Sequence, residues 1–188
     1  SNGVKVLKQC DALVALYKPS QVLSHPVRSR HEDYKCILDC SYDFEEECYV
    51  GNDGKKLYLC NRIDKGTSGI IMASETRTDG EALKALFKAR EVDKQYVALC
   101  HGRISNLPDE EKVWIDRVVV DRSEGKQARV KKGDGVEAVT MLRGVKQGFF
   151  PLVTGENIPI LRVDIAPRTG ITHQLRYQLF QRGLSIVN

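Results

Sequence analysis

The sequence lacks long apolar runs, a signal-peptide pattern and the common nucleotide-binding and metal-binding motifs. No apolar stretch approaches the roughly 18 residues that a helix needs to cross a bilayer. The chain has neither a P-loop, nor a Gly-x-Gly-x-x-Gly run, nor a metalloprotease helix. These absences argue against membrane insertion, nucleotide hydrolysis and common metal chemistry. We therefore expect an intracellular protein, cytoplasmic or organellar and not secreted.

Cysteine pairs are also lacking, although the chain contains six cysteines. Scattered thiols without a Cys-x-x-Cys pair are typical of a reducing compartment. Histidine and cysteine are common zinc ligands, and four of them occur close together at His31, Cys36, Cys40 and Cys48. Their spacing matches no common zinc pattern. We expect free, partly buried thiols and no metal site.

The charge is unevenly distributed along the chain. The net charge is +4, but residues 32–53 alone carry −7 and the remainder carries +11. A basic surface suits a polyanionic partner such as nucleic acid. It is equally compatible with an ordinary soluble basic protein.

The 188 residues suffice for one domain with a substantial core. Apolar residues predict two short strands at 4–8 and 12–17, and Pro19 ends the second. Lys18 is expected to be a surface cation. The acidic segment that follows predicts a short helix and then a mobile loop near residues 45–54.

The stretch from 59 to 74 predicts two strands around a polar loop. The loop places one carboxylate, Asp64, beside the cations Arg62 and Lys65, with Thr67 and Ser68 following. Such a loop is either a functional site or an ordinary turn in which Asp64 accepts backbone hydrogen bonds. Its composition alone leaves both interpretations open.

Downstream, apolar spacing predicts a helix capped by Thr78 or Asp79 that ends near Arg90. Its expected buried face consists of Ala82, Leu83, Leu86 and Phe87. Strands are predicted at 94–100, 113–120, 136–142 and 158–167, with Tyr96 and Ala98 on one face of the first. The basic residues 126–132 suit a hairpin tip or a loop that faces RNA.

The last helix is predicted to begin at Thr172 as its cap, with Leu175 and Leu179 on the buried side and Gly183 as the stop. Residues 185–188 are predicted to start a further strand.

Four motifs in this order resemble the RluA family of RNA pseudouridine synthases. Residues 11–26 resemble its opening Lys-Pro and His-Pro motif, and residues 61–69 its His-Arg-Leu-Asp-x-x-Thr-Ser-Gly motif. Residues 94–96 are similar to its Lys-x-Tyr strand, with the expected glycine at Gly102. Residues 169–176 resemble its Thr-Gly-Arg-Thr-His-Gln-x-Arg motif.

The resemblance implies a role for each matching residue. Asp64 would be the catalytic aspartate, Tyr96 would pack on the target base, and Arg176 would orient Asp64 through an ion pair. The residues expected to bind RNA or substrate are Arg62, Thr67, Lys94, Thr172, His173 and Gln174. The family uses no metal or organic cofactor.

The chemistry explains why such residues are needed. Uridine isomerisation breaks the bond from uracil nitrogen to the anomeric carbon, and a carboxylate can attack covalently or stabilise developing charge. A nearby arginine favours the ionised carboxylate. Aromatic stacking offsets the cost of extracting a base. The mechanism by which Asp64 acts stays open.

The sequence departs from the family pattern at Asn61 in place of histidine, at Ser20 and Gln21 in place of Ala-Gly, and at Ile171 in place of arginine. The family's usual continuation after the last strand is not matched within residues 1–188, and we expect no N-terminal RNA-binding module. We expect that the chain is trimmed at its C-terminus or that this part of the fold is missing.

The resemblance predicts an α+β pseudouridine synthase fold, with a mixed, mostly antiparallel sheet flanked by helices and a central RNA-binding cleft. We expect one catalytic domain over residues 1–188, a monomer that acts on rRNA or tRNA. One alternative is a non-catalytic RNA-binding or RNA-chaperone relative. Another is a nucleosidase or glycosidase that releases free uracil.

Overall fold

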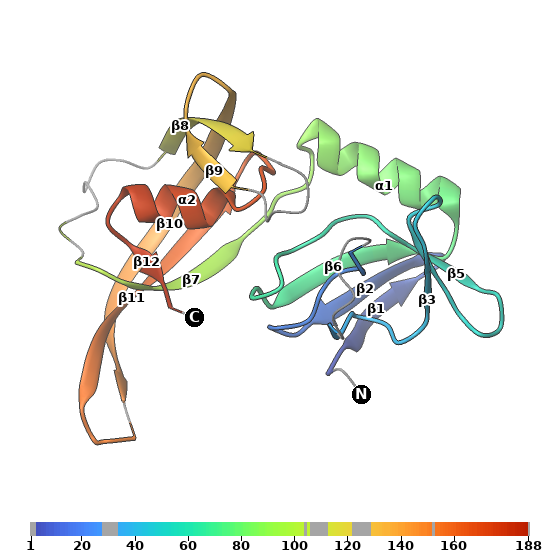
Figure 1. Ribbon diagram of the computed structural model, residues 1–188, viewed down its shortest axis with the longest axis horizontal. Helices are drawn as coiled ribbons and strands as arrows, with labels where there is room; N and C mark the ends of the chain where they lie inside the picture. Colours follow the sequence, from blue (N-terminus) through green and yellow to red (C-terminus); the bar gives the residue numbers. More distant parts are fainter. Residues whose placement is uncertain are drawn as a thin grey trace. The chain divides into compact units, whose positions relative to one another are not determined.

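The computed structural model of the chain describes residues 3–27, 34–103, 105, 113–121, 129–151 and 153–187. The chain divides into two compact units, Ser1–Val92 and Asp93–Asn188, here called unit 1 and unit 2. Among these described residues, each unit contains one six-stranded sheet and one helix (Figure 1). The single catalytic domain expected over residues 1–188 remains a prediction.

Unit 1 is built on a sheet of order β1-β2-β6-β5-β4-β3, in which every named pair is antiparallel. Alternation along the second strand buries Val14 and Leu16, as the apolar pattern predicts. Their core neighbours include Ile37, Tyr49 and Ile71. The strands are β1 (Lys5–Cys10), β2 (Leu13–Lys18), β3 (Ser41–Asp43), β4 (Cys48–Val50), β5 (Lys56–Leu59) and β6 (Gly69–Ser74).

The acidic segment forms no helix among its described residues, so that prediction is wrong. It forms the β3–β4 hairpin instead, and strand β4 occupies part of the expected loop. The Asp43 carboxylate accepts hydrogen bonds from the backbone nitrogens of Glu45 and Glu46 at 2.8 and 3.0 Å. This side-chain turn competes with a helix, and Tyr49 then packs into the core at 1 % exposure.

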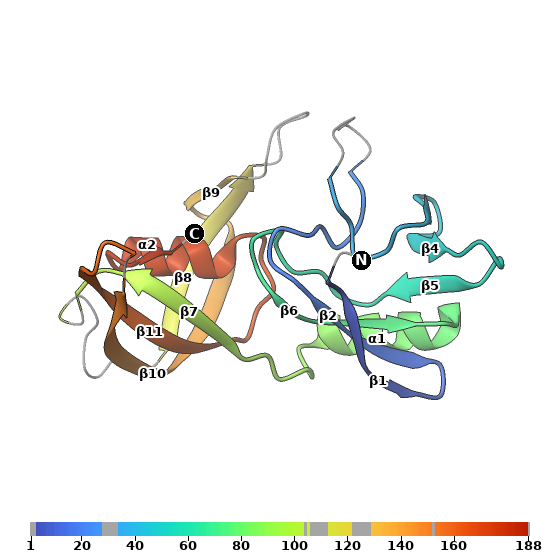
Figure 2. The ribbon, with the colours of Figure 1, turned by 90° about the horizontal axis from the view of Figure 1, so that it is seen from below.

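Helix α1 (Arg77–Ala89) covers one face of the unit 1 sheet and contacts β5 and β6 (Figure 2). The N-cap is Thr76 and not the predicted Thr78 or Asp79, because Thr76 Oγ1 accepts a hydrogen bond from the Asp79 nitrogen at 3.2 Å. Arg90 ends the helix in a left-handed conformation. The helix approaches the sheet through Gly80, where an added Cβ would lie 3.2 Å from Tyr58 Cβ.

The expected buried face of α1 is wrong in consequence. Gly80, the point of close approach to the sheet, is the buried residue of the helix, whereas Leu86 is 43 % exposed. The other members of that stripe are exposed or half-buried: Ala82, Leu83 and Phe87.

Unit 2 contains a second antiparallel sheet, of order β12-β7-β11-β10-β8-β9. Helix α2 lies across this sheet in Figure 1. The core includes Trp114, Val163 and Leu179, all at 0 % exposure. The elements are β7 (Tyr96–His101), β8 (Val113–Asp121), β9 (Arg129–Lys132), β10 (Val136–Pro151), β11 (Asn157–Pro167), α2 (Gln174–Gln181) and β12 (Ser185–Ile186).

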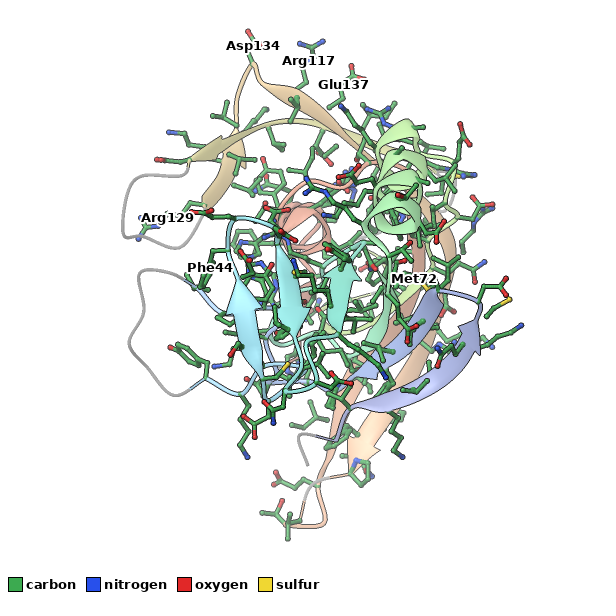
Figure 3. All side chains as sticks on the ribbon, turned by 90° about the vertical axis from the view of Figure 1, so that its right-hand side faces the viewer. Phe44, Met72, Arg117, Arg129, Asp134 and Glu137 are labelled. Atoms are coloured by element: carbon green, nitrogen blue, oxygen red, sulfur yellow. The ribbon has the colours of Figure 1, made fainter. Side chains whose placement is uncertain are left out.

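Strand β10 runs nine residues beyond the predicted end at Leu142. It pairs with β11 from Thr140 opposite Pro167 to Pro151 opposite Asn157. Arg117 of β8 lies 3.9 Å from Asp134, in the turn between β9 and β10, and 3.6 Å from Glu137 of β10 (Figure 3). Of the basic segment, residues 129–132 form β9, and residues 126–128 lie outside the described part.

Helix α2 begins two residues after the predicted cap. His173, not Thr172, is the N-cap, with φ of 53° and without a side-chain capping hydrogen bond. Leu179 is fully buried, as predicted, and Gly183 follows the helix with a φ of 69°. The predicted α+β class with mostly antiparallel pairing is confirmed. The central RNA-binding cleft remains a prediction.

Candidate functional site

The loop that carries Asp64 is a tight turn between β5 and β6. The Asp64 carbonyl accepts a hydrogen bond from the Thr67 nitrogen at 3.0 Å, and the Lys65 carbonyl accepts one from the Gln21 nitrogen at 2.8 Å. The Asp64 side chain is half-buried. The loop is therefore fixed both by its own turn and by the segment after β2.

Lys18, expected to be a surface cation, is completely buried beneath this loop. Its ammonium donates hydrogen bonds to the carbonyls of Pro19, Val22 and Lys65, at 2.9, 2.6 and 3.2 Å. Burial lowers the pKa of Lys18 to about 8, and the negative charge of Asp64 acts in the opposite direction. The sequence carried a signal for this burial, because Lys18 continues the alternation of Val14 and Leu16.

Two serines complete the attachment of the loop. Ser20 Oγ donates to the Gly66 carbonyl at 2.9 Å. Ser24 Oγ donates to the Ile63 carbonyl at 3.0 Å and accepts from the Ile63 nitrogen at 3.3 Å. Backbone groups on both sides of Asp64 are thus held by side chains from residues 18–24.

Arg62 and Lys65 flank the carboxylate but have defined contacts of their own. Arg62 is exposed, and its Nη1 lies 2.7 Å from His25 Nε2. Lys65 Nζ lies 4.2 Å from the centre of the Tyr34 ring, a cation–π geometry. Thr67, the other residue predicted here to bind RNA, closes the Asp64 turn through its backbone.

Two departures from the family pattern have structural consequences in unit 1. The Asn61 amide accepts a hydrogen bond from the Met72 nitrogen at 2.7 Å and donates to the Ile70 carbonyl at 3.4 Å. Asn61 therefore holds the start of the loop against strand β6. Gln21 has a φ of 65°, a left-handed conformation that favours the glycine common at this position of the family pattern.

In unit 2, Tyr96 opens β7 opposite Ile165 and packs, half-buried, against the core. The strand alternation predicted for Tyr96 and Ala98 is confirmed, because Ala98 is buried and Val97 is exposed. Lys94 Nζ donates to the Thr169 carbonyl at 2.9 Å. This bond joins the strand that carries Tyr96 to the segment that leads into α2.

The first turn of α2 carries Arg176, which is half-buried, as are Thr172 and His173. Gln174 differs, because it is 5 % exposed and bonded inside unit 2. Its Oε1 accepts from Thr169 Oγ1 at 2.7 Å, and its Nε2 donates to Thr140 Oγ1 at 2.9 Å. This geometry gives Gln174 a positioning role and offers no support for direct RNA contact.

A second buried glutamine fixes α2 to the sheet. Gln178 Oε1 accepts from Thr140 Oγ1 at 2.6 Å, and its Nε2 donates to Asp116 at 2.7 Å. Asp116 also accepts from Arg182 at 3.1 Å. Because buried polar groups must be paired, this network defines the position of the helix that presents Arg176.

The predicted site residues therefore form two groups. Unit 1 carries Arg62, Asp64 and Thr67, and unit 2 carries Lys94, Tyr96, Thr172, His173, Gln174 and Arg176. The ion pair of Asp64 with Arg176 joins residues of different units and stays a prediction. Sequence reasoning missed Lys18, Ser24 and His25, which lie in the Lys-Pro and His-Pro motif that the resemblance had used only for recognition.

No group of three or more His, Cys, Asp or Glu side chains suited to a metal ion occurs among the described residues, which do not include His31. Within the same residues, neither helix has the length and apolar character required to span a membrane.

The sequence profile of the RNA pseudouridylate synthase family matches residues 12–181. The chain belongs to this family, and its relatives place it among RluA-type members, which confirms the resemblance. The match extends over the loop of Asp64, strand β7 and helix α2.

Among its relatives, an uncharacterized RNA pseudouridine synthase of Helicobacter pylori strain J99 is 28 % identical over 86 % of this chain and 49 % of its own length. The dual-specificity RNA pseudouridine synthase RluA of Yersinia pestis is 26 % identical over 97 % of this chain and 78 % of its own. The chain spans about half the length of the Helicobacter relative.

Among solved structures, human RNA pseudouridylate synthase domain containing 1 is similar in fold, with a TM-score of 0.68. It is 21 % identical, and the similarity covers 99 % of this chain and 68 % of the human chain.

Proposed function

We propose that this chain converts uridine to pseudouridine in structured RNA, ribosomal or transfer RNA, and that Asp64 is the catalytic carboxylate. The observation that carries the proposal is the fixation of the Asp64 turn by Lys18, Ser20 and Ser24. Such preorganisation is what a reacting carboxylate requires. The names of the relatives, RNA pseudouridine synthases, support the same reaction.

The other residues have roles that follow from their chemistry. Tyr96 packs on the target base, and Arg176 pairs with Asp64 and favours its ionised form. Arg62, Thr67, Lys94, Thr172 and His173 bind the RNA around the target uridine, and Gln174 positions the segment that carries Arg176. Arginine and lysine near the site supply contacts to phosphate.

The test is pseudouridine mapping of total RNA from cells that lack this protein, after incubation with the purified chain. We expect new pseudouridine at defined uridines with the wild type. Asp64→Asn should lower the rate by on the order of 1,000-fold or more, with RNA binding retained. Asp53→Asn is the matched control, because Asp53 is an exposed loop aspartate of unit 1.

The same experiment separates the alternatives. RNA binding without any pseudouridine from the wild type would favour a non-catalytic RNA-binding relative. Release of free uracil would favour a nucleosidase or glycosidase. Equal rates for wild type and Asp64→Asn would exclude Asp64 as the catalytic carboxylate.

A further inference from the structure

A cavity of about 280 Å³ opens in unit 1 on the side of the Asp64 loop that carries Arg62. Its lining includes His25, Tyr42, Phe44, Arg62 and Lys84, and it is called the Phe44 pocket below. None of these residues except Arg62 has a role in the proposed reaction. The lining combines aromatic rings with cations, which is the composition that binds single-stranded nucleic acid.

The aromatic wall is built as a packed cluster. The Tyr42 ring stacks on His25, with centroids 5.6 Å apart and an interplanar angle of 18°. Phe44 contacts Tyr42 edge-on at 5.1 Å, and the buried Tyr49 does so at 4.9 Å. Figure 3 shows the Phe44 side chain at the outer edge of the unit 1 sheet. The rings are therefore held in place before any ligand arrives.

The tautomer of His25 determines how Arg62 is held at the pocket. His25 Nδ1 lies 2.6 Å from the Pro26 carbonyl, which accepts only if this nitrogen carries the proton. His25 Nε2 then accepts from Arg62 Nη1 at 2.7 Å. Burial, more than the charge of Arg62, lowers the pKa of His25 and favours this neutral form. The guanidinium is thus fixed at the pocket.

Ser24, the residue before His25, connects the pocket to the loop that carries Asp64. Ser24 forms both hydrogen bonds to the Ile63 backbone, so His25 and Arg62 are held as neighbours of that clamp. Tyr49 Oη donates to the Ser24 carbonyl at 2.9 Å and fixes the segment from the core. A ligand in the pocket is therefore placed relative to Asp64, two residues beyond Arg62.

The lining favours a base over a phosphate group. The Glu47 carboxylate belongs to the lining and pairs with Lys84 at 3.5 Å, so one of the two cations is already neutralised. Leu59 and Cys60 add apolar and weakly polar surface. A phosphate would meet the repulsion of Glu47, whereas a planar base gains stacking and cation–π contacts.

We propose that the Phe44 pocket binds a nucleobase of the substrate RNA that flanks the target uridine and has left its stack. This proposal rests on the proposed function only for the identity of the RNA. Its energetic role is to offset the cost of unstacking near the target, which amounts to a few kcal/mol for each extruded base. The pocket would thereby select RNAs in which two nearby bases can unstack.

The first test uses adenosine as the probe and ribose 5-phosphate as the probe without a base. In backbone and side-chain NMR titrations of the chain, adenosine should shift the signals of Tyr42, Phe44 and Arg62. Ribose 5-phosphate at the same concentration should leave them in place. Equal shifts with both probes, or no shifts with adenosine, would overturn the proposal.

The second test measures pseudouridine formation as a function of RNA concentration. Phe44→Ala should raise KM by about 5- to 150-fold, the effect of losing one stacked base, with little change in kcat. Phe44→Tyr should restore the wild-type KM because it keeps a ring. Val6→Ala truncates an exposed apolar residue of β1 elsewhere in unit 1 and should change neither constant.

The two tests distinguish a failure of the pocket proposal from a failure of the proposed function. A wild-type KM in Phe44→Ala would overturn the proposal although the enzyme works. If the wild type forms no pseudouridine, the proposed function fails, and the adenosine titration alone then decides whether the pocket binds a base.

Discussion

The ammonium of Lys18 donates a hydrogen bond to the carbonyl of Lys65, the residue that follows Asp64, at 3.2 Å. This bond connects the end of β2 with the loop that carries the proposed catalytic carboxylate. Since Lys18 is fully buried and also bonded to the Pro19 and Val22 carbonyls, it cross-links the segment after β2 to the Asp64 loop. It is a positioning residue for the loop, and its charge lies close enough to Asp64 for each to affect the other.

Replacing Lys18 tests this cross-link. Lys18→Met should lower the rate of pseudouridine formation by about tenfold or more, because the carbonyls of the loop lose their donor and Asp64 loses its fixed position. Lys18→Arg should not restore the rate, since a guanidinium cannot replace a compact ammonium at this site. Lys8→Met, at an exposed lysine of β1, is the control. Wild-type activity in Lys18→Met would contradict the positioning role.

The pH dependence of stability provides a second prediction for the same residue. The pKa of Lys18 is lowered from 10.5 to about 8 in the folded chain. Between these values the unfolded chain holds a proton that the folded chain has lost. The free energy of unfolding of the wild type should therefore rise with pH from about 8 to 10.5, relative to Lys18→Met. Denaturant titrations of both proteins at several pH values measure this difference, and parallel curves would refute it.

Gly102 predicts a stability effect in unit 2. Its φ is 142°, and an added Cβ would lie 2.5 Å from Leu184 Cδ2 and 2.8 Å from the Gly183 carbonyl. Gly102→Ala should lower the free energy of unfolding by about 2 kcal/mol or more, because the backbone after β7 must move away from the end of α2. Gly148→Ala is the matched control, since nothing lies within 4 Å of its added Cβ. Chemical denaturation compares the two variants.

Replacing Gln21 should raise the free energy of unfolding. It holds a left-handed φ of 65° without the freedom of glycine. Gln21→Gly should raise the free energy of unfolding by up to about 1 kcal/mol, because the strain of an L side chain at positive φ exceeds the added entropy of the unfolded chain. Ser20→Gly should do the reverse, since it removes the hydrogen bond to Gly66. A destabilised Gln21→Gly would show that the side chain has contacts worth more than the strain.

The sequence was most informative where one local pattern dominates. Alternation identified β2 and β7 and placed Ala98 inside, and helical spacing correctly placed Leu179 in the core. Helix ends were less accurate. Thr76 and Thr78 both satisfy the preferences for an N-cap, and only the approach of Gly80 to the sheet decides the register of α1.

The failures have a common physical origin in contacts between distant segments. The segment before β4 has helical spacing, yet Tyr49 enters a core formed by strands elsewhere in unit 1. A buried ammonium is rare, so the sequence favours a surface position for Lys18, and its three carbonyl partners cannot be foreseen from composition. Motif resemblance located Asp64, but the clamp from Ser24 and the contact of His25 with Arg62 depend on how the chain folds back on itself.

The distribution of the six thiols has a practical consequence for measurement. Cys10 is exposed, Cys36 and Cys40 are half-buried, and Cys48, Cys60 and Cys100 are buried. Burial raises the pKa of the five other thiols, to about 11 for Cys60 and Cys100. Since the thiolate is the species that reacts with maleimides, a fluorophore should attach selectively at the end of β1. The folded chain therefore carries its own labelling position, away from the Asp64 loop in sequence, for following RNA association by anisotropy.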